Sequence, residues 1–576
     1  MKRNLLKDNI TEMIILGAII LLGGILRIYT LGDRNLWEDE IAQVSQYLSV
    51  KSIPYLINRA AYHFQTPLDY MIGYVFTMLF GFSEFTVRFP AFLFGTFSLL
   101  PIYFLTRYIF SVDVAIIAVG ITAISKWMIA YSQEARPYSI FIFFLFISLY
   151  FFIRALNENK KIFYQLYGIS AFFMILSRGY EPLIVVFVLY IVTIGLYLRY
   201  RLTTIIFCRS EFIYRITRVN IIIGILYLPF IYVLLTRLLE KRIFVSSVAN
   251  NSYYWEQMVS LMRHYKNLTF YPLSYFITLL LVLGILFIIN KRYKTPLKIW
   301  FILTAVLLVS TQFIIYLKIA NLNVAPFAMR YMIYWLPLIY IIISYTIVSI
   351  SKQIGILVRD RISYRVISFF ILLPIIIIFG RNTHAYYYEQ KEDWRGSSSY
   401  IRTLINSNDI VWIETPWPYG SYGGYQPVFI GKPIYFPEIR DFSTDAIIKY
   451  VTENRQINGN VILVYYGIKT PIQLDNNNLM IRNFHRIAVI SLRNSGPFIL
   501  DNIRALLDEM ENIYPEDSSR VRIYLAKARL LFAEKRYEES YIMIRKAKAM
   551  VPQVQLSRFS ESVARFFPGL DSKQIE

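Results

Sequence analysis

The chain has 576 residues, of which 56% are hydrophobic, and a formal net charge of +22. This apolar fraction excludes a single soluble domain, and the lone cysteine, Cys208, excludes an intramolecular disulfide. Lys and Arg lie mostly in short loops between apolar runs, which is typical of a membrane protein rather than of a nucleic-acid-binding protein.

Apolar runs long enough to cross a bilayer recur through the first two thirds of the chain, and we predict a transmembrane domain over residues 1–380. Lys2 and Lys7 precede the first run and no small-residue cleavage site follows it, so this run is expected to stay as an anchor. Placing the basic clusters in the cytoplasm predicts about eleven spans, an inner N-terminus and an extracytoplasmic chain after Arg381, in a plasma or inner membrane. The predicted spans are 10–28, 89–106, 113–131, 138–153, 162–178, 182–198, 219–236, 273–290, 299–317, 331–350 and 364–380.

Two segments fit this topology less simply. Residues 68–82 are apolar but short, and we predict an interfacial or re-entrant helix in the first outer loop. The loop 237–272 contains five Lys and Arg residues although the topology places it outside. Such cations would suit an anionic lipid headgroup.

An acidic stretch, LWEDEIAQ (36–43), follows the first predicted span. Carboxylates are costly in hydrocarbon, so this stretch is expected outside the bilayer. Asn35 and Glu38 have the spacing of a helix capping box, which would give Glu38 a structural role. The residues alone leave two interpretations open for Asp39 and Glu40, a catalytic pair or the acidic first turn of a helix.

Three further stretches place charged groups on the same predicted face. They are SQEARPYS (132–139) with Glu134 and Arg136, GFSEFTVRFP (81–90) with Glu84 and Arg88, and PFAMRYMIYWLP (326–337) with Arg330 and Tyr331. Each has an ordinary structural interpretation: an ion pair at a helix junction, a helical salt bridge, and anchors at the membrane interface. Together they predict carboxylates and guanidinium groups at one level of one face.

These stretches resemble the GT-C superfamily of integral-membrane glycosyltransferases, most of all the bacterial branch related to protein O-mannosyltransferases and aminoarabinose transferases. The matching stretches follow the order of that family: LWEDEIAQ, QTPLDYMIGYVF (65–76), SEFTVRFPAFLFG (83–95), YSQEARPYSIFIFF (131–144), RYMIYWLP (330–337) and KEDWRGSSSYI (391–401). Family members often have His-Pro-Pro-Leu-Tyr where this chain has Gln65 to Asp69. A role of that His or Tyr is therefore not carried over, and Asp69 adds a carboxylate.

The resemblance implies transfer of a sugar from a polyprenyl phosphate to an acceptor hydroxyl on the extracytoplasmic face, with inversion. A phosphate leaving group needs no general acid, whereas the acceptor needs a base, and the resemblance assigns that catalytic role to Asp39 with Glu40 beside it. The predicted substrate- and lipid-phosphate-binding residues are Arg88, Glu134, Arg136, Arg330 and Tyr331. No cofactor is certain, and a divalent metal is left open. The acceptor is a lipid, a glycan or a protein, and no nucleic acid is expected.

The rest of the chain predicts a soluble α/β layer structure over residues 381–500. Its expected elements are helices at 396–406 and near 443–454, strands at 409–414, 460–467 and 485–492, and a loop at 419–425. In the helical tail, residues 501–576, the segment 521–552 resembles one tetratricopeptide repeat, which would bind a protein partner. An ordinary helical hairpin is the alternative.

Three other functions fit part of the sequence. A transporter or flippase for a lipid substrate would explain the many spans, but it would usually place ionisable residues in mid-span and show repeated halves. A surface-polysaccharide polymerase or ligase also uses polyprenyl carriers and needs no acids after its first helix. A membrane anchor that presents the repeat is the third. The sugar and the acceptor are not specified by the sequence.

Overall fold

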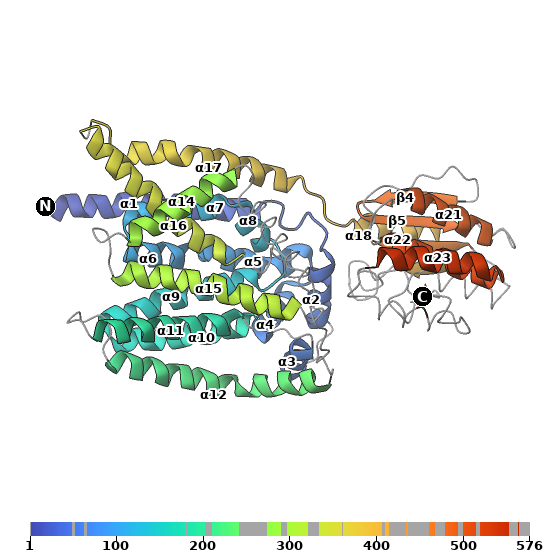
Figure 1. Cartoon of the computed structure of the whole chain (residues 1–576), viewed down its shortest axis with the longest axis horizontal. Coiled ribbons are helices and arrows are strands. Elements are labelled where there is room, and N and C mark those ends of the chain that lie inside the picture. The colour runs from blue at the N-terminus through green and yellow to red at the C-terminus, as the bar shows by residue number, and fades with distance from the viewer. Residues whose placement is uncertain are drawn as a thin grey trace. The chain divides into compact units, whose positions relative to one another are not determined.

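The computed structural model is mainly helical and divides into two compact units (Figure 1). The helical unit comprises Met1–Asp33 and Gln46–Glu389, and the sheet unit comprises Arg34–Ser45 and Gln390–Glu576. The structure describes residues 2–48, 52–62, 66–178, 181–201, 210–240, 273–289, 296–320, 333–359, 361–405, 409–413, 434–435, 460–466, 479–492, 499–513, 519–551 and 563.

Each segment of the chain that was predicted to span the membrane contains one helix or two consecutive helices. The helices of the helical unit are α1 (Lys2–Ile28), α3 (Ile53–Tyr62), α4 (Pro67–Phe80), α5 (Glu84–Phe97), α6 (Leu99–Ile109), α7 (Val112–Ile124), α8 (Lys126–Ser132), α9 (Tyr138–Glu158), α10 (Lys161–Ser177), α11 (Glu181–Arg201), α12 (Ser210–Glu240), α14 (Leu273–Ile289), α15 (Pro296–Ala320), α16 (Trp335–Leu357) and α17 (Tyr364–Tyr387), while α2 (Glu38–Leu48) crosses the boundary between the units. Within the described residues, five helices are long and apolar enough to cross a membrane, or up to six if the bent pair α7–α8 is one span. A polytopic helical protein is thus supported, and the predicted number of about eleven spans stays a prediction.

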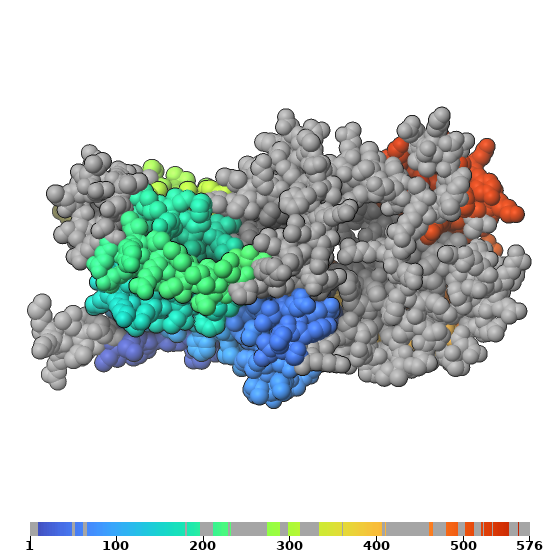
Figure 2. All heavy atoms as spheres, turned by 90° about the horizontal axis from the view of Figure 1, so that it is seen from below, coloured from blue at the N-terminus to red at the C-terminus, as the bar shows by residue number. Residues whose placement is uncertain are grey.

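The helices differ in how deeply they are buried. Of the span window of α16, 78% is buried inside the unit, whereas the corresponding shares for α1 and α17 are 11% and 22%. Large apolar side chains are also exposed on α11 and α12, which appear in teal and green in Figure 2. Apolar surface of this kind is typical of a protein that contacts lipid.

The predicted span 113–131 is not one straight helix. It consists of α7 and α8, which meet at Ser125 with a bend of 61°. Ser125 has an extended backbone, with φ −68° and ψ 119°. Such a break deprives the last carbonyl groups of α7 of helical amide partners, which is unfavourable in an apolar environment unless other donors replace them.

Two neighbouring helices supply those donors. The buried guanidinium of Arg27, on α1, donates from Nη1 to the Ala123 carbonyl at 3.0 Å and from Nη2 to the Thr122 carbonyl at 3.2 Å. Thr383, on α17, donates from Oγ1 to the Ile124 carbonyl at 2.8 Å. The break is therefore held by α1 and α17, which fixes the direction of α8 and of the loop that follows it.

The sheet unit combines a five-stranded sheet with helices. Its elements are α18 (Trp394–Leu404), β1 (Ile410–Ile413), β2 (Ile434–Tyr435), β3 (Val461–Tyr466), β4 (Leu479–Phe484), β5 (Ile487–Leu492), α21 (Ile499–Ile513), α22 (Ser519–Ala533) and α23 (Tyr537–Met550). The strand order is β2-β1-β3-β5-β4, in which β2, β1 and β3 are parallel and β5 is antiparallel to both of its neighbours. Every residue of β5 is buried, which is expected of a strand covered on both faces.

Most of the predicted elements of this unit have counterparts in the structure. The predicted segments 396–406, 409–414, 460–467 and 485–492 correspond to α18, β1, β3 and β5. Strands β2 and β4 were not predicted, and α21 falls almost wholly within the predicted helical tail 501–576 without having been predicted as a separate helix. The predicted helix near 443–454 and loop at 419–425 lie outside the described residues.

The segment with the resemblance to a tetratricopeptide repeat forms a helical hairpin from α22 and α23. The small residues Ala528, Ser540 and Ala547 are buried between these helices and their surroundings. The Ser540 hydroxyl donates to the Ala528 carbonyl at 2.7 Å. The small side chains allow close packing, and the assignment as a true repeat stays a prediction.

Candidate functional site

The acidic stretch begins α2, but its helix cap differs from the predicted one. Helix α2 starts at Glu38, and its first helical hydrogen bond runs from the Ile41 amide to the Trp37 carbonyl at 3.0 Å. The Trp37 amide in turn donates to Oε2 of Glu40 at 3.3 Å. Glu40 therefore makes the capping-box contact of the third helical residue. The predicted box of Asn35 with Glu38 is wrong because the helix begins too late for Asn35 to cap it.

Glu40 is fully buried and held by a cation. Lys391 donates from Nζ to Oε2 of Glu40 at 3.1 Å. A buried carboxylate is unfavourable unless it is paired and hydrogen-bonded, and Glu40 is both. Asp39, one residue earlier, is only partly buried. The two predicted catalytic acids thus have different environments, one fully buried and one partly exposed.

The stretch KEDWRG (391–396) packs directly against the acidic stretch. Asn35 donates from Nδ2 to Oδ1 of Asp393 at 3.1 Å and accepts from Nε of Arg395 at 2.6 Å. Asp393 also caps α18, because its Oδ1 accepts from the Gly396 amide at 2.9 Å. Two stretches that the sequence linked only through their order in a family are therefore bonded to each other within the sheet unit.

In the helical unit, the loop 133–137 that follows α8 is anchored by Gln133. Its Nε2 donates to the carbonyl oxygens of Arg27 at 3.0 Å and Tyr29 at 2.6 Å, both at the end of α1. Its Oε1 accepts from the Tyr386 hydroxyl, at the end of α17, at 3.0 Å. The predicted site residues Glu134 and Arg136 therefore lie on a loop fixed at the same ends of α1 and α17.

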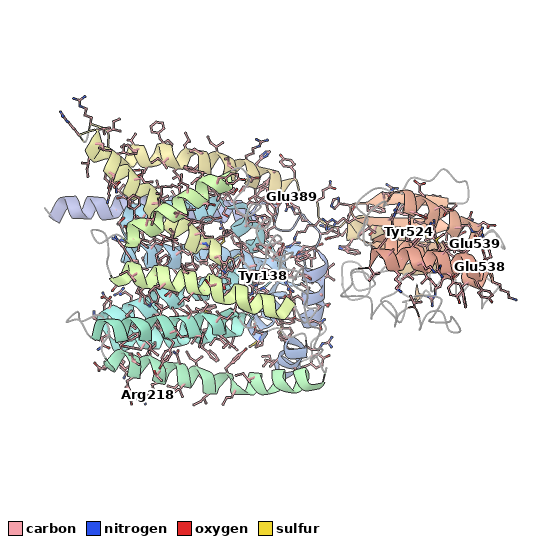
Figure 3. All side chains as sticks on the ribbon, in the orientation of Figure 1. Tyr138, Arg218, Glu389, Tyr524, Glu538 and Glu539 are labelled. Carbon is pink, nitrogen blue, oxygen red and sulfur yellow. The ribbon has the colours of Figure 1, made fainter. Side chains whose placement is uncertain are left out.

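Aromatic and charged side chains surround this loop. The Cζ atom of Arg136 lies 5.9 Å from the centre of the Tyr138 ring, and that of Arg178 lies 4.7 Å from it. Tyr138, labelled in Figure 3, thus contacts two guanidinium groups. Arg178 is buried and pairs with Glu181, with 2.9 Å between Nε and Oε1. The arrangement places two guanidinium groups, one of them paired with a carboxylate, next to an aromatic ring.

Asp69, in the first turn of α4, brings a carboxyl group into the same electrostatic environment. It is 8% exposed, and its Oδ2 atom has no hydrogen-bond partner. Helix α4 is not among the candidate spans. Burial raises the pKa of Asp69 to about 7, and the nearby positive charge of Arg136 opposes that rise. From the sequence, Asp69 was noted only as a departure from the family pattern, because its burial depends on tertiary packing.

The remaining predicted site residues have varied positions. Arg88 is buried and donates from Nη1 to the Leu31 carbonyl at 3.1 Å, which ties α5 to the chain before the acidic stretch. Arg330 and Tyr331 lie outside the described residues. Within the described part of the chain, no three His, Cys, Asp or Glu side chains are grouped so as to hold a metal ion.

The structure therefore gathers the predicted residues into two groups. Arg88, Glu134 and Arg136 belong to the helical unit, as does Asp69, which was not predicted as a site residue, whereas Asp39 and Glu40 belong to the sheet unit. The predicted meeting of these carboxylates and guanidinium groups in one site stays a prediction.

Comparison with known protein families supports the resemblance. Residues 65–210, about a quarter of the chain, match the family model described as dolichyl-phosphate-mannose-protein mannosyltransferase. The matched segment contains Asp69, Arg88, Glu134 and Arg136. The predicted resemblance to GT-C membrane glycosyltransferases is confirmed. No curated protein matches the chain.

Solved structures of low sequence identity also align with the chain. ArnT from Cupriavidus metallidurans in the apo state is 10% identical with a TM-score of 0.49, and the alignment covers 84% of this chain and 98% of that one. The same protein bound to undecaprenyl phosphate is 10% identical with a TM-score of 0.45, and the alignment covers 83% of this chain and 97% of that one. The archaeal oligosaccharyltransferase AglB from Archaeoglobus fulgidus, in complex with an inhibitory peptide and a dolichol-phosphate, is 12% identical with a TM-score of 0.47, and the alignment covers 98% of this chain and 87% of that one. All three TM-scores are below 0.5, a level that does not establish a common fold.

Proposed function

We propose that this chain, in which residues 65–210 match the protein mannosyltransferase family, is a membrane glycosyltransferase that uses a polyprenyl-phosphate-linked hexose or pentose. It would transfer the sugar to an acceptor hydroxyl on the extracytoplasmic face. The observation that carries the proposal beyond the family match is the contrast within the acidic pair. Glu40 is buried and paired with Lys391, whereas Asp39 is partly accessible in the first turn of α2.

In this mechanism Asp39 is the general base. Its carboxylate takes the proton of the acceptor hydroxyl while the acceptor oxygen attacks the anomeric carbon of the sugar. The bond from that carbon to the phosphate oxygen breaks, and the electron pair leaves with polyprenyl phosphate. One displacement inverts the anomeric configuration. The leaving phosphate needs no proton, so a single carboxylate suffices.

Glu40 has a positioning role in this proposal. Its carboxylate is already engaged by Lys391 and by the Trp37 amide, so it holds the first turn of α2 and thereby the orientation of Asp39. Asn35, bonded to Asp393 and Arg395, fixes the preceding residues in the same way. The predicted catalytic pair is thus divided into a base and its support.

The donor phosphate is assigned to the cationic groups of the helical unit. Arg136, beside Tyr138, can stabilise the charge that develops on the phosphate as the sugar leaves. Glu134 would orient that arginine or the sugar from the same loop. Arg88 supports the site through its bond to the Leu31 carbonyl. Arg330 and Tyr331 complete the proposed phosphate site on the basis of sequence alone.

The test compares surface glycans and envelope lipids, by mass spectrometry, in cells that lack the gene and express wild type, Asp39→Asn or Asp33→Asn. A glycan or lipid should lose one sugar in the deletion strain, recover it with wild type and Asp33→Asn, and not recover it with Asp39→Asn. Asp33 is an exposed acid outside α2, so it is the matched control. Identical glycans and lipids in all strains would contradict the proposal.

The runner-up function is a transporter or flippase for a lipid or polyprenyl-linked substrate. It predicts movement of an intact lipid across the membrane, with no new glycosidic bond. Purified protein in vesicles, supplied with a sugar-linked polyprenyl phosphate and an acceptor extract, would separate the two. Release of sugar-free polyprenyl phosphate would support a transferase, and sugar-linked lipid in the opposite leaflet would support a flippase.

A further inference from the structure

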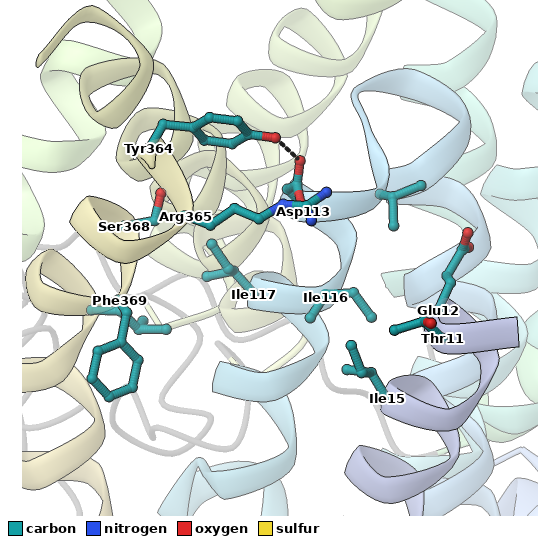
Figure 4. A pocket seen from close by; sticks show the side chains of 12 residues that line it. Thr11, Glu12, Ile15, Asp113, Ile116, Ile117, Tyr364, Arg365, Ser368 and Phe369 are labelled. Carbon is teal, nitrogen blue, oxygen red and sulfur yellow. Dashed lines mark hydrogen bonds and ion pairs between the residues drawn. The ribbon is translucent and has the colours of Figure 1, made fainter. Parts of the chain in front are cut away.

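A groove lies in the helical unit between α1, α7 and α17, away from the site described above (Figure 4). Its volume is about 680 Å³, within the usual range of ligand pockets, roughly 300–1,000 Å³. On α1 the groove is lined by Thr11, Glu12 and Ile15. The loop of the site described above is instead anchored by Gln133 to the carbonyl oxygens of Arg27 and Tyr29, at the other end of α1. At a rise of about 1.5 Å per residue, these two places are roughly 20 Å apart along α1.

The inner part of the groove is apolar and accessible. Ile116 and Ile117 of α7 contribute to the lining, together with Ile15 of α1 and Phe369 of α17. Ile15 is 42% exposed and Phe369 is 53% exposed. Because α1 and α17 are the least buried candidate spans, this lining is expected to face lipid in a membrane. An acyl chain fits such a surface.

One end of the groove carries a cationic group held in a fixed position. Asp113 accepts from the Tyr364 hydroxyl at 2.8 Å, a contact drawn in Figure 4. It also accepts from Nε of Arg365 at 3.1 Å. The Arg365 side chain is still 72% exposed. The Nζ atom of Lys352 lies 5.2 Å from the centre of the Tyr364 ring.

The charges at this end favour an anion. Glu12 also lines the groove, and it pairs with Arg107, with 3.0 Å between Oε1 and Nε. The two carboxylates are Glu12 and Asp113. Glu12 is paired with Arg107 and Asp113 with Arg365, and Lys352 is a third cation, so the positive charges outnumber the negative ones by one. Lys352 and Arg365 bound one of the basic clusters that were placed in the cytoplasm, residues 352–365, and the cytoplasmic leaflet is rich in anionic lipid.

Ser368 supplies a second, independent indication of a ligand. It lines the groove one turn after Arg365, is 5% exposed, and its Oγ atom has no hydrogen-bond partner. A buried hydroxyl without a partner is unfavourable, so an acceptor supplied by a ligand would satisfy it. Along α17 the groove therefore presents a cation, then a hydroxyl, then apolar side chains. A glycerophospholipid has a phosphate, ester carbonyls and acyl chains in that same order.

We propose that this groove binds an anionic glycerophospholipid from the surrounding membrane. The phosphodiester would lie against Arg365 and Lys352, an ester carbonyl would accept from Ser368, and an acyl chain would lie on Ile116 and Phe369. The site is separate from the proposed donor site and does not depend on the proposed transferase activity.

The proposal is tested with full-length protein in detergent, by native mass spectrometry with added phosphatidylglycerol and with phosphatidylcholine of the same acyl chains. Wild type should retain one phosphatidylglycerol in preference to phosphatidylcholine. Lys352→Gln leaves the Asp113–Arg365 pair intact and should reduce that preference, and Arg365→Gln should reduce it by about tenfold or more. Arg361→Gln, at an exposed arginine outside the lining, is the matched control.

Ser368→Ala separates the ester contact from the headgroup contact. Both lipids contain the ester, so this variant should bind each of them more weakly while the preference between them persists. Melting temperatures in lipid-free detergent show whether each variant is folded. Absence of bound phospholipid from wild type, an unchanged preference in both Lys352→Gln and Arg365→Gln, or displacement of the phospholipid by equimolar polyprenyl phosphate would overturn the proposal.

Discussion

Lys391 reaches the buried carboxylate of Glu40, with 3.1 Å between Nζ and Oε2, although the two residues are 351 positions apart in the chain. This contact, together with the bonds of Asn35 to Asp393 and Arg395, joins the acidic stretch to the stretch after α17. The orientation of Asp39 therefore depends on residues that local sequence around it does not contain.

The Glu40–Lys391 pair should contribute to stability as a unit. Removing one partner leaves a buried charge uncompensated, so Glu40→Gln or Lys391→Met alone should destabilise the protein, by up to roughly 3 kcal/mol. The double variant removes both charges and should lose less than the sum of the single losses. Melting temperatures of the four proteins measure this coupling. Strictly additive losses would show that the pair is not coupled.

Asp69 should make stability depend on pH. Its pKa is raised from the ordinary value of 3.8 to about 7, so the unfolded chain loses this proton before the folded chain does. The resulting penalty is absent below about pH 4, grows between about pH 4 and pH 7, and reaches at most about 4 kcal/mol above that.

Replacing the carboxyl group tests this dependence. Asp69→Asn cannot titrate, so it should melt at a higher temperature than wild type at pH 8, with a difference that shrinks as the pH falls towards 4. Asp33→Asn makes the same substitution at an exposed position and is the matched control. A difference that is the same at pH 5 and pH 8 would place the carboxyl of Asp69 in a more solvated environment.

Arg27 should be structural rather than catalytic. Its guanidinium satisfies the carbonyl oxygens of Thr122 and Ala123 at the break between α7 and α8. Arg27→Met leaves both without these donors, and each buried unsatisfied group costs about 1–3 kcal/mol. We therefore expect a marked fall in melting temperature, compared with little change for Arg381→Met at an exposed position of α17. Equal melting temperatures for the two variants would exclude this role.

Much of the helical unit could be predicted because long apolar runs are a local signal of helices. The bend at Ser125 could not, because it is stabilised by Arg27 and Thr383 from distant helices. The cap of α2 was misassigned for a related reason. Glu38 and Glu40 both suit a first helical turn. In the structure Glu40 makes the capping contact, and its carboxylate is also bound by Lys391, which lies far along the chain.

The candidate site was predictable mainly where the sequence matched a family pattern. Asp39 and Arg136 stood out first as members of charged stretches expected outside the bilayer, but their roles in the site were assigned through the family resemblance. The burial of Asp69 and the proximity of Arg178 to Tyr138 depend on the packing of α4, α9 and the end of α10, which residue patterns do not encode. Strand β4, LMIRNF, was missed because its apolar and polar residues alternate only weakly.

Arg330 provides a test of the proposed phosphate site that does not need the position of the Arg330 side chain to be known. Arginine can bind a phosphate through two parallel hydrogen bonds, and lysine cannot. Arg330→Lys should therefore weaken binding of the polyprenyl phosphate donor by about tenfold or more without changing the melting temperature. Donor affinity measured on purified protein decides the matter, and an unchanged affinity would remove Arg330 from the site.

Asp39 is the residue on which the proposed chemistry depends most. Asp39→Asn keeps the size and the hydrogen-bonding groups of the side chain but removes the base. General-base assistance is worth roughly a hundred- to ten-thousand-fold in rate. Sugar transfer by purified Asp39→Asn should fall by about that factor, with expression and melting temperature close to those of wild type.

Its two neighbours give the matched comparison. Glu38→Gln should retain most activity, because no base is assigned to that position. Glu40→Gln should lose stability and activity together, since it disturbs the first turn of α2 that orients Asp39. Loss of the base should lower the transfer rate without lowering the melting temperature, whereas loss of the positioning residue should lower both. If Asp39→Asn transfers sugar at the wild-type rate, the acidic stretch only begins a helix, and the base must be sought among other carboxylates, with Asp69 the first to examine.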